Sequence, residues 1–381
     1  MEVSSLRSAA LDIFRAGLRA ANPYRLMRQH AHLEGSTWHY ESPGASVTWE
    51  LPAQGCPGRV LVVGAGKAAA SLARALEESL GHGVSGGRIV VKHGHGFPLK
   101  HIVVEEGGHP LPNLDGQTGT RRLLDDLADT GPEDRILFLL TGGASALLVA
   151  PAEPVTLEDK IQTTRQLLSC GATIQEMNAV RKHLSTVKGG RLLEQMAPAR
   201  VLTLIVSDVV GDDLSAIGSG PTAPDPSTFA DALAVLRRYG LTDRVPGHVL
   251  WRLTEGAAGR APETPKPGEP LFDSAEHVIL ASNRLSLEAA ERQAASMGFR
   301  PEVFACDMVG STHERARAFA ARLLEGSGKG RLALLAGGET TLTVAGSGKG
   351  GRNQEFALVT ACEMHARKGL LVLSAGTDGT D

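Results

Sequence analysis

Six short runs of apolar residues, each ending at a glycine or near a single polar side chain, constrain the fold of this chain more than any other feature. Runs of Val, Ile and Leu of this length are typical of buried parallel strands. In open α/β sheets, ligands bind just past the carboxyl ends of such strands, so the sequence predicts its functional residues at strand ends. The runs are 59–63 before Gly64, 136–140 before Thr141, 201–206 before Ser207, 278–280 before Ala281, 332–335 before Ala336 and 370–373 before Ser374.

Between the runs lie stretches with helical spacing, at 67–80, 116–128, 157–170 and 174–185, and two more strand-like runs at 88–91 and 101–104. This alternation predicts two three-layer α/β/α domains with right-handed crossovers. We expect a Rossmann-like, mostly parallel sheet in the first domain and a smaller mixed sheet in the second. Because prolines cluster between 246 and 270, the predicted domains are 1–243 and 272–381, joined by a linker at 244–271.

The bulk composition excludes some classes of protein. A net charge of −3 leaves no basic surplus for nucleic acid. No apolar run approaches the ~18 residues that a membrane span needs. The four cysteines are far apart and lack metal-binding spacing, which indicates reduced core thiols in a cytoplasmic protein.

The first strand end carries Gly64-Ala65-Gly66-Lys67-Ala68-Ala69, which matches the dinucleotide-binding fingerprint G-x-G-x-x-A. Small residues there let the backbone approach a phosphate, and the helix that follows attracts its charge. The acid that NAD-binding chains carry after the next strand is replaced by Lys92 and His93, which disfavours NAD. A cation in the first helical turn opposes the macrodipole, so we interpret Lys67 as the partner of an anionic ligand; a lysine that points to solvent is the alternative.

The second strand end carries Gly142, Gly143 and Ser145. Backbone amides of such a turn bind phosphate or carboxylate as a nest, and Ser145 is a natural helix cap. Capping alone is the alternative, and the two roles are compatible.

The third strand end carries three carboxylates, Asp208, Asp212 and Asp213. Carboxylates at a strand end suit Mg²⁺ coordination or a general base. The alternative is that Asp208 caps the following turn.

In the second domain, Asn283 and the segment 337–340 follow apolar runs, and Arg352 stands at the end of a glycine-rich loop. Exposed amides beside an arginine suit a polyphosphate; a flexible hairpin tip is the alternative. The spacing of His93, His95, His101 and His109 does not indicate zinc, so we interpret these residues as solvated or structural. Predicted nucleotide or phosphate contacts are Gly64, Gly66, Gly142, Gly143, Ser145, Asn283, Gly337, Gly338, Glu339, Thr340, Gly348 and Gly350.

Taken in order, these motifs resemble those of the class II glycerate 2-kinases, the family with a MOFRL-type C-terminal domain. The resemblance runs from Phe14 to Asp378. The motifs that carry it lie at 64–69, 141–147, 178–185, 188–190, 207–213, 218–222, 336–340, 350–355 and 376–379.

The resemblance implies transfer of the γ-phosphoryl group of ATP to the 2-hydroxyl of D-glycerate, with Mg²⁺, to give 2-phosphoglycerate. It implies that the catalytic residues Lys67, Asp208 and Arg352 line a cleft between the two domains. Asp208 would accept the hydroxyl proton or, with Asp212, hold the metal. The glycerate would be bound by Arg181 or Lys188 through its carboxylate, and by Asp378.

Other expectations stay open at this point. The rivals are an NAD(P)-dependent hydroxypyruvate reductase and a non-catalytic sugar-phosphate-binding protein. A homodimer is one expectation for the assembly. Because related chains continue past the last motif, an incomplete second domain is another expectation.

Overall fold

The computed structural model describes residues 3–53, 55–326, 328, 330–342, 348–365, 367–377 and 379. They form two compact units, Leu26–Leu280 and Met1–Arg25 together with Ala281–Asp381. Helix α1 (Val3–Ala20) therefore belongs with the C-terminal residues, whereas the sequence placed it in the first domain. Each unit is described here by itself.

The larger unit is built on a six-stranded sheet with the order β6-β5-β4-β7-β8-β9. The pairs β4/β5, β4/β7, β5/β6 and β7/β8 are parallel, which confirms the Rossmann-like α/β prediction. The chain builds outward from β4 to β6 and then returns to place β7 on the other side of β4. The strands are β4 (Val60–Ala65), β5 (Arg88–Lys92), β6 (Val103–Gly107), β7 (Arg135–Thr141), β8 (Arg200–Val206) and β9 (Ala275–Ala281).

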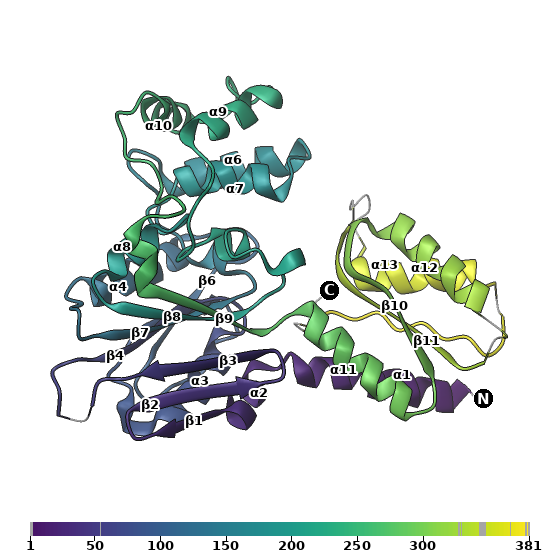
Figure 1. Cartoon of the computed structure of the whole chain (residues 1–381). Coiled ribbons are helices and arrows are strands. Elements are labelled where there is room, and N and C mark those ends of the chain that lie inside the picture. The colour runs from purple at the N-terminus through teal and green to yellow at the C-terminus, as the bar shows by residue number, and fades with distance from the viewer. Residues whose placement is uncertain are drawn as a thin grey trace. The chain divides into compact units, whose positions relative to one another are not determined.

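Two layers cover this sheet because its strands are apolar on both faces. Helices α4 (Leu114–Leu127) and α8 (Arg191–Met196) pack on the face that carries Val63 and Phe138. Helix α3 (Ala69–Leu80) and a small antiparallel sheet lie on the other side (Figure 1). In that small sheet the buried Trp38 and Trp49 face each other across two strands. Its strands are β1 (Ala31–Glu34), β2 (Thr37–Ser42) and β3 (Ala45–Glu50), preceded by α2 (Pro23–His30).

A group of four helices extends from the sheet and has a core of its own (Figure 1). The helices are α6 (Leu157–Ser169), α7 (Ile174–His183), α9 (Phe229–Arg238) and α10 (Gly247–Ala257). The first three begin at capping boxes formed by Thr156, Thr173 and Thr228, which satisfy amides that a helix start leaves without partners. Helix α10 lies inside the segment predicted as a linker, because its apolar residues Val249 and Leu253 pack into this core.

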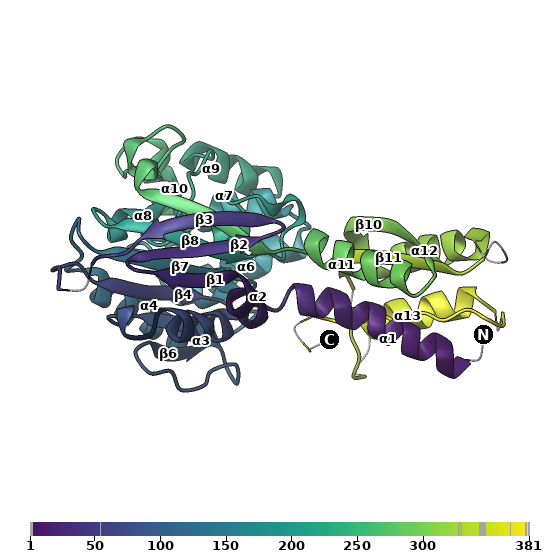
Figure 2. The same cartoon turned by 60° about the horizontal axis from the view of Figure 1, so that its bottom comes forward.

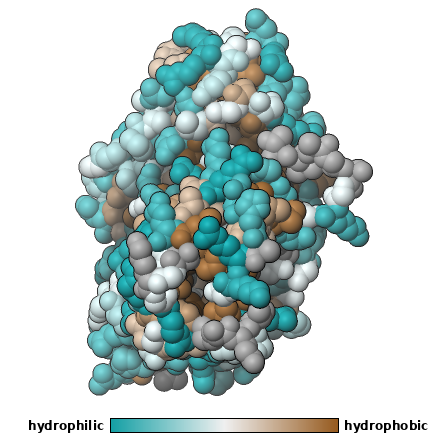
Figure 3. All heavy atoms as spheres, turned by 90° about the vertical axis from the view of Figure 1, so that its right-hand side faces the viewer, coloured by the Kyte–Doolittle hydropathy of each residue, from teal (hydrophilic) through white to brown (hydrophobic). Residues whose placement is uncertain are grey.

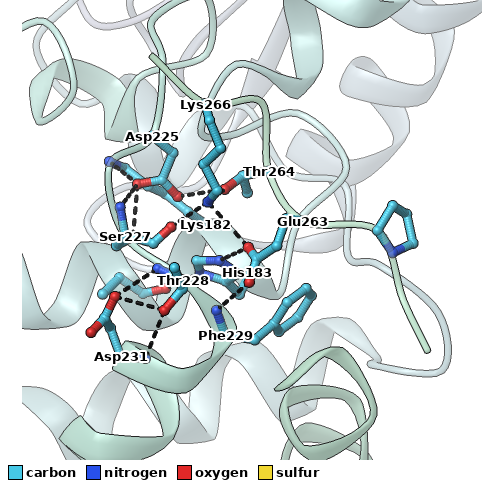
Figure 4. Close-up of polar contacts among 12 residues, drawn as sticks. Lys182, His183, Asp225, Ser227, Thr228, Phe229, Asp231, Glu263, Thr264 and Lys266 are labelled. Carbon is cyan, nitrogen blue, oxygen red and sulfur yellow. Dashed lines mark hydrogen bonds and ion pairs between the residues drawn. The ribbon is translucent and has the colours of Figure 1, made fainter. Parts of the chain in front are cut away.

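A buried ionic network fixes α7 in this group (Figure 4). The Lys182 ammonium lies 3.1 Å from Asp225, and both side chains are almost fully buried. Burial alone would raise the pKa of Asp225, but Lys182 and two hydrogen bonds from Ser227 lower it. Next to this pair, His183 Nε2 lies 2.9 Å from the Glu263 carboxylate. The end of α7 is therefore anchored by one buried ion pair and by the contact of the buried His183 with the partly exposed Glu263.

The smaller unit contains two parallel strands, β10 (Arg300–Ser311) and β11 (Leu332–Thr341). Helix α11 (Asn283–Ser296) with α1 covers one face, and α12 (Thr312–Gly326) with α13 (Arg352–Glu363) covers the other (Figures 1 and 2). Nearly all side chains of the two strands are half-buried or exposed. Brown, hydrophobic areas accordingly reach the surface between teal ones on the face in Figure 3.

Three sequence expectations about these elements were wrong. The run 370–373 is not a strand, because no neighbouring strand pairs with it in the part of the chain that the structure describes. Helix α3 begins at Ala69, so Lys67 precedes the helix instead of opposing its macrodipole. The cysteines are unpaired as expected, but Cys56, Cys306 and Cys362 are exposed rather than in a core.

The remaining short elements are α5 (Ala144–Leu147) and the 3₁₀ segments Gly81–Gly83, Val210–Asp212, Ile217–Ser219 and Pro270–Ser274. Among the described residues, no helix has the length and apolar character to cross a lipid bilayer.

The buried ionic network predicts a large effect of Lys182→Met. The substitution leaves the Asp225 carboxylate buried without its cation, so we expect the free energy of unfolding to fall by about 3–5 kcal/mol. Denaturant unfolding followed by circular dichroism measures the change. Arg284→Met, which removes an exposed ion pair with Glu288, is the control and should cost less than about 1 kcal/mol. Equal effects of the two substitutions would contradict this account of the network.

Candidate active site

The carboxyl ends of β4 and β7 lie side by side where the strand order reverses, which is where ligands bind in open α/β sheets. The backbone of the segment after β4 is tied to the end of β7. The amide of Lys67 donates to the carbonyl of Gly142 at 2.9 Å, and the amide of Ala68 donates to Thr141 Oγ1 at 3.1 Å. Lys67 is therefore held beside the turn that follows β7.

The two fingerprint glycines are required by the neighbouring strand. A Cβ atom at Gly64 would lie 2.4 Å from the carbonyl oxygen of Leu139, and one at Gly66 would lie 2.1 Å from Thr141 Oγ1. Gly66 also has a φ of 134°, a conformation that L side chains rarely adopt. Close packing of β4 on β7 thus explains both residues, and their contact with a phosphate stays a prediction.

Three polar side chains gather over Gly142 and Gly143. A Cβ atom at Gly142 would lie 2.4 Å from Oδ2 of Asp208. A Cβ atom at Gly143 would lie 3.0 Å from the His109 ring and 3.3 Å from Cγ of Lys67. The two glycines therefore leave room for an ammonium, an imidazole and a carboxylate above one turn of backbone.

His109 is a residue that the sequence interpretation missed. It was grouped with three other histidines as solvated or structural, yet it lies against Gly143 beside Lys67. The motif of small residues at 141–144 marks where a neighbouring side chain has to fit, but it does not say which one. Only the fold brings the segment after β6 to this turn.

The sequence predicted that Ser145 caps a helix, but in the structure it does not. Helix α5 begins at Ala144 with Gly143 at the cap, so Ser145 is free to bond sideways. Its Oγ lies 2.8 Å from Oγ of Ser219, which in turn donates to Oδ1 of Asn178 at 3.0 Å. Ser219 has a φ of 65°, and strain of this kind in a residue other than glycine clusters at functional sites.

The predicted substrate cations lie in the same unit. Lys188 is 2% exposed, and its Nζ donates to the carbonyl and the Oγ of Ser145 at 2.8 and 3.3 Å. Arg181 is on α7, one turn after Asn178. Burial lowers the pKa of Arg181 and, with the positive charges of Lys160 and Arg181, lowers the pKa of Lys188. The sequence interpretation missed Lys160, because a single lysine in an amphipathic helix carries no signal of burial.

The predicted metal ligands differ in their surroundings. Asp208 is exposed at the end of β8, and Mg²⁺ suits such a site because it keeps several waters and binds one or two carboxylates. Asp212 ends the short 3₁₀ segment Val210–Asp212 with a φ of 53°. A separate group whose ligand atoms lie within 4.8 Å of one another, His32, Glu34 and His39, is on β1 and β2.

The predicted residues of the smaller unit form a second group. The segment 337–340 lies inside β11 and is not a strand-to-helix turn, because β10 continues beyond two bulges and pairs with it. Arg352 is the first residue of α13, and its Nη1 donates to Oε1 of Glu339 at 2.7 Å. Both side chains are partly exposed, at 44% and 54%.

The other predicted residues of this unit are Asn283, Gly337, Gly348 and Gly350. The Asn283 amide donates to the carbonyl of Cys306 at 2.5 Å, and a Cβ atom at Gly337 would lie 2.1 Å from Oδ1 of Asn283. Gly348 and Gly350 are exposed. Asp378 lies outside the described residues. A shared cleft for Lys67, Asp208 and Arg352 stays a prediction, because the two units are described separately.

Comparison with known proteins shows the family of this chain. A domain of unknown function, DUF4147, matches residues 9–254, and the MOFRL family matches residues 332–381. Glycerate 2-kinase of Pyrococcus horikoshii is 36% identical over 387 residues, which cover 100% of this chain and 84% of that protein. A putative hydroxypyruvate reductase of Agrobacterium vitis is 38% identical over 331 residues, 85% of this chain and 73% of that one.

A solved structure extends the comparison to the fold. The crystal structure of glycerate kinase from Thermotoga maritima matches with a TM-score of 0.80 and 36% identity, covering 99% of this chain and 84% of that chain.

The contact between β4 and β7 predicts that Gly66→Ala will be strongly destabilising. The new Cβ atom would meet Thr141 in a backbone conformation that alanine disfavours, so we expect a loss of about 3 kcal/mol in the free energy of unfolding. Gly247→Ala is the matched control, since nothing lies within 4 Å of a Cβ atom there. Thermal and denaturant unfolding of both variants provides the comparison. A stable Gly66→Ala protein would show that the strand ends are not packed as described.

Proposed function

Because this chain belongs to the glycerate kinase family, we propose that it transfers the γ-phosphoryl group of ATP to the 2-hydroxyl of D-glycerate, giving 2-phosphoglycerate. The observation that carries the proposal is the gathering of Lys67, His109 and Asp208 over Gly142 and Gly143 at the ends of adjacent strands. This is an arrangement of charge and small residues that suits a phosphorylated ligand.

Phosphoryl transfer depends on positioning and charge stabilisation more than on covalent chemistry. The backbone of Gly142 and Gly143 would lie along the phosphates, between the side chains of Lys67, His109 and Asp208. Lys67 would neutralise charge that develops on the transferred group. Its attachment through the Gly142 carbonyl keeps its backbone in place, so little reorganisation is needed.

Asp208 is proposed to accept the proton of the substrate hydroxyl or to hold Mg²⁺, with Asp212 as the second metal ligand. When bound, Mg²⁺ supplies positive charge that neutralises the nucleotide phosphates. The exposed carboxylate of Asp208 beside Gly142 fits either role.

The acceptor and the nucleotide would engage further residues. Arg181 or Lys188 would bind the glycerate carboxylate, and Asp378 is proposed to contact the substrate. Arg352 is proposed to act on the nucleotide phosphates, where it would exchange its partner Glu339 for a phosphate oxygen. Contacts from Asn283, from 337–340 and from Gly348 and Gly350 are part of the same proposal.

A reductase is the second candidate, because two relatives are named putative hydroxypyruvate reductases. NAD-binding chains of this kind present an acid after the second strand, whereas β5 ends at Lys92 and is followed by His93. Oxidation of NADH or NADPH by hydroxypyruvate, followed by nicotinamide absorbance, distinguishes this function from a kinase.

The proposed function is tested by a coupled assay of ADP release with ATP, Mg²⁺ and D-glycerate. We expect ADP formation that depends on D-glycerate, and 2-phosphoglycerate rather than 3-phosphoglycerate as the product. Lys67→Ala and Asp208→Asn should each lower kcat by about 10²–10³-fold while the circular dichroism spectrum is retained. Lys100→Ala, at an exposed lysine, is the control. Near-normal kcat in either site variant would remove that residue from the catalytic role.

Arg352 has its own prediction because it belongs to the other unit. Arg352→Ala should raise KM for ATP and lower kcat/KM by about tenfold or more, since an arginine pairs with two phosphate oxygens at once. Arg284→Ala, on the same unit, is the matched control. If only the unfolding transition changed and the kinetic constants did not, Arg352 would be a structural partner of Glu339 alone.

A further inference from the structure

Lys160, Arg181 and Lys188 form a group that we call the cationic cluster. Lys160 is on α6 and 7% exposed, and Lys188 follows α7 and is 2% exposed. Arg181 lies between them in sequence, on α7, which packs against α6. Burial lowers the pKa of Lys160 and of Lys188, and the positive charge of Arg181 lowers both further, with Lys160 adding to the effect on Lys188. Three basic side chains thus share one largely buried region.

The cationic cluster has no counter-ion within the residues that the structure describes. Lys160 Nζ is buried and has no hydrogen-bond partner, and Lys188 Nζ donates only to Ser145. On the same helices, Glu158 is exposed, and the other two acids are bonded elsewhere. Asp159 lies beside His248 of α10. Glu176 accepts hydrogen bonds from Arg238, the last residue of α9, and from Tyr239, which follows it.

An unpaired buried charge is costly, and like charges nearby increase the cost. A lysine that served only packing would be replaced by methionine without loss, because apolar residues of similar volume are equal or better in a core. Groups that are perturbed by burial and by like charges are candidates for ligand binding. The missing negative charge is therefore expected from a ligand.

The cationic cluster adjoins the candidate active site through a chain of short contacts. Lys188 bonds Ser145, which is two residues beyond Gly143 and bonds Ser219. Ser219 donates to Asn178, which lies one helical turn before Arg181. An anion bound by the cluster would thus lie close to the turn where Lys67 and Asp208 meet.

We propose that the cationic cluster binds the carboxylate of the acceptor substrate and that Lys160, previously without a role, takes up a proton as the carboxylate binds. The identity of the acceptor rests on the proposed function. A single carboxylate matches the cluster because Arg181 stays charged and burial strongly disfavours charge on Lys188. The planar guanidinium pairs with two carboxylate oxygens.

The protonation of Lys160 follows from its surroundings. Burial, reinforced by repulsion from Arg181, lowers the pKa of Lys160 to about 7. A neighbouring carboxylate favours the charged form and raises that pKa. In the free protein Lys160 is already charged below pH 7, so binding needs no proton there. Above pH 7 each binding event has to take up a proton, and affinity falls by as much as about tenfold per pH unit.

Calorimetric titration with D-glycerate at pH 7, in buffers of different ionisation enthalpy, measures the proton uptake. We expect about half a proton per molecule bound. Lys160→Met should abolish the uptake and its pH dependence, and should raise Kd for D-glycerate at pH 6 at least tenfold. Lys160→Gln should change both in the same direction. The Kd for ATP should stay unchanged in both variants.

The free energy of unfolding distinguishes a role of Lys160 in substrate binding from a structural role. Because Lys160→Met removes an unpaired buried charge, we expect an equal or higher free energy of unfolding together with weaker D-glycerate binding. Lys100→Met, at an exposed lysine, is the matched control and should alter neither. Unchanged Kd and unchanged proton uptake in Lys160→Met would overturn the inference, as would proton uptake on binding ATP or inorganic phosphate but not D-glycerate.

Failure of the proposed function gives a different result. If no ADP forms with D-glycerate, but glycolate or lactate binds with proton uptake that Lys160→Met abolishes, the carboxylate site stands and the kinase assignment falls. If ADP forms normally and Lys160→Met has the wild-type KM for D-glycerate, the kinase stands and the site falls.

Discussion

The close contact between the ends of β4 and β7 is the constraint on which the rest of the candidate site depends. Gly64 and Gly66 permit that contact because a side chain at either position would overlap β7. Once the strands are this close, the amide of Lys67 reaches the Gly142 carbonyl. The reversal of strand order then separates the following connections and leaves Gly142 and Gly143 uncovered by backbone. Side chains from three strand ends fill the space.

Helix α7 shows how the chain combines rigidity with an unfavourable charge. Lys182 and His183 are paired with Asp225 and Glu263, so the end of the helix is anchored in a core of its own. Arg181, in the same turn, has no such partner in the described ranges. If the end of α7 were loosely held, it could move until Arg181 reached solvent or an acidic side chain. The neighbouring ion pairs prevent that movement, because they fix the backbone on which Arg181 stands.

The sequence predicted those features that depend on neighbours in the chain. Apolar runs located β4, β7 and β8 because buried parallel strands need them, and Lys67, Asp208 and Gly142 were found from their places at strand ends. It failed where distant partners decide the structure. The segment 337–340 became part of β11 because β10 extends alongside it, and the run 370–373 has no described strand to pair with.

Side chains that act through burial were the hardest to predict. His109 was grouped with three other histidines, and only the return of the chain after β6 brings it to Gly143. Lys160 looks like an ordinary polar position of an amphipathic helix until α7 covers it. The same holds for Ser145, whose neighbours suggested a cap although its hydroxyl bonds Ser219. A pattern of residue types specifies local geometry, whereas charge without a partner is a property of the folded chain.

That distinction bears on how the fold sustains its site. Removing one partner from the ionic network around Asp225 destabilises the folded state, whereas removing a charge from the cationic cluster does not. Both groups include residues of α7, and the residues of the network are those that the proposed reaction does not use. In the free protein, the charge of the cluster is unfavourable, and a bound anion would remove that cost. The arrangement therefore lowers the stability of the free protein and raises its affinity for the anion. Substitutions in the cluster should therefore shift stability and affinity in opposite directions, whereas substitutions in the network should lower both together.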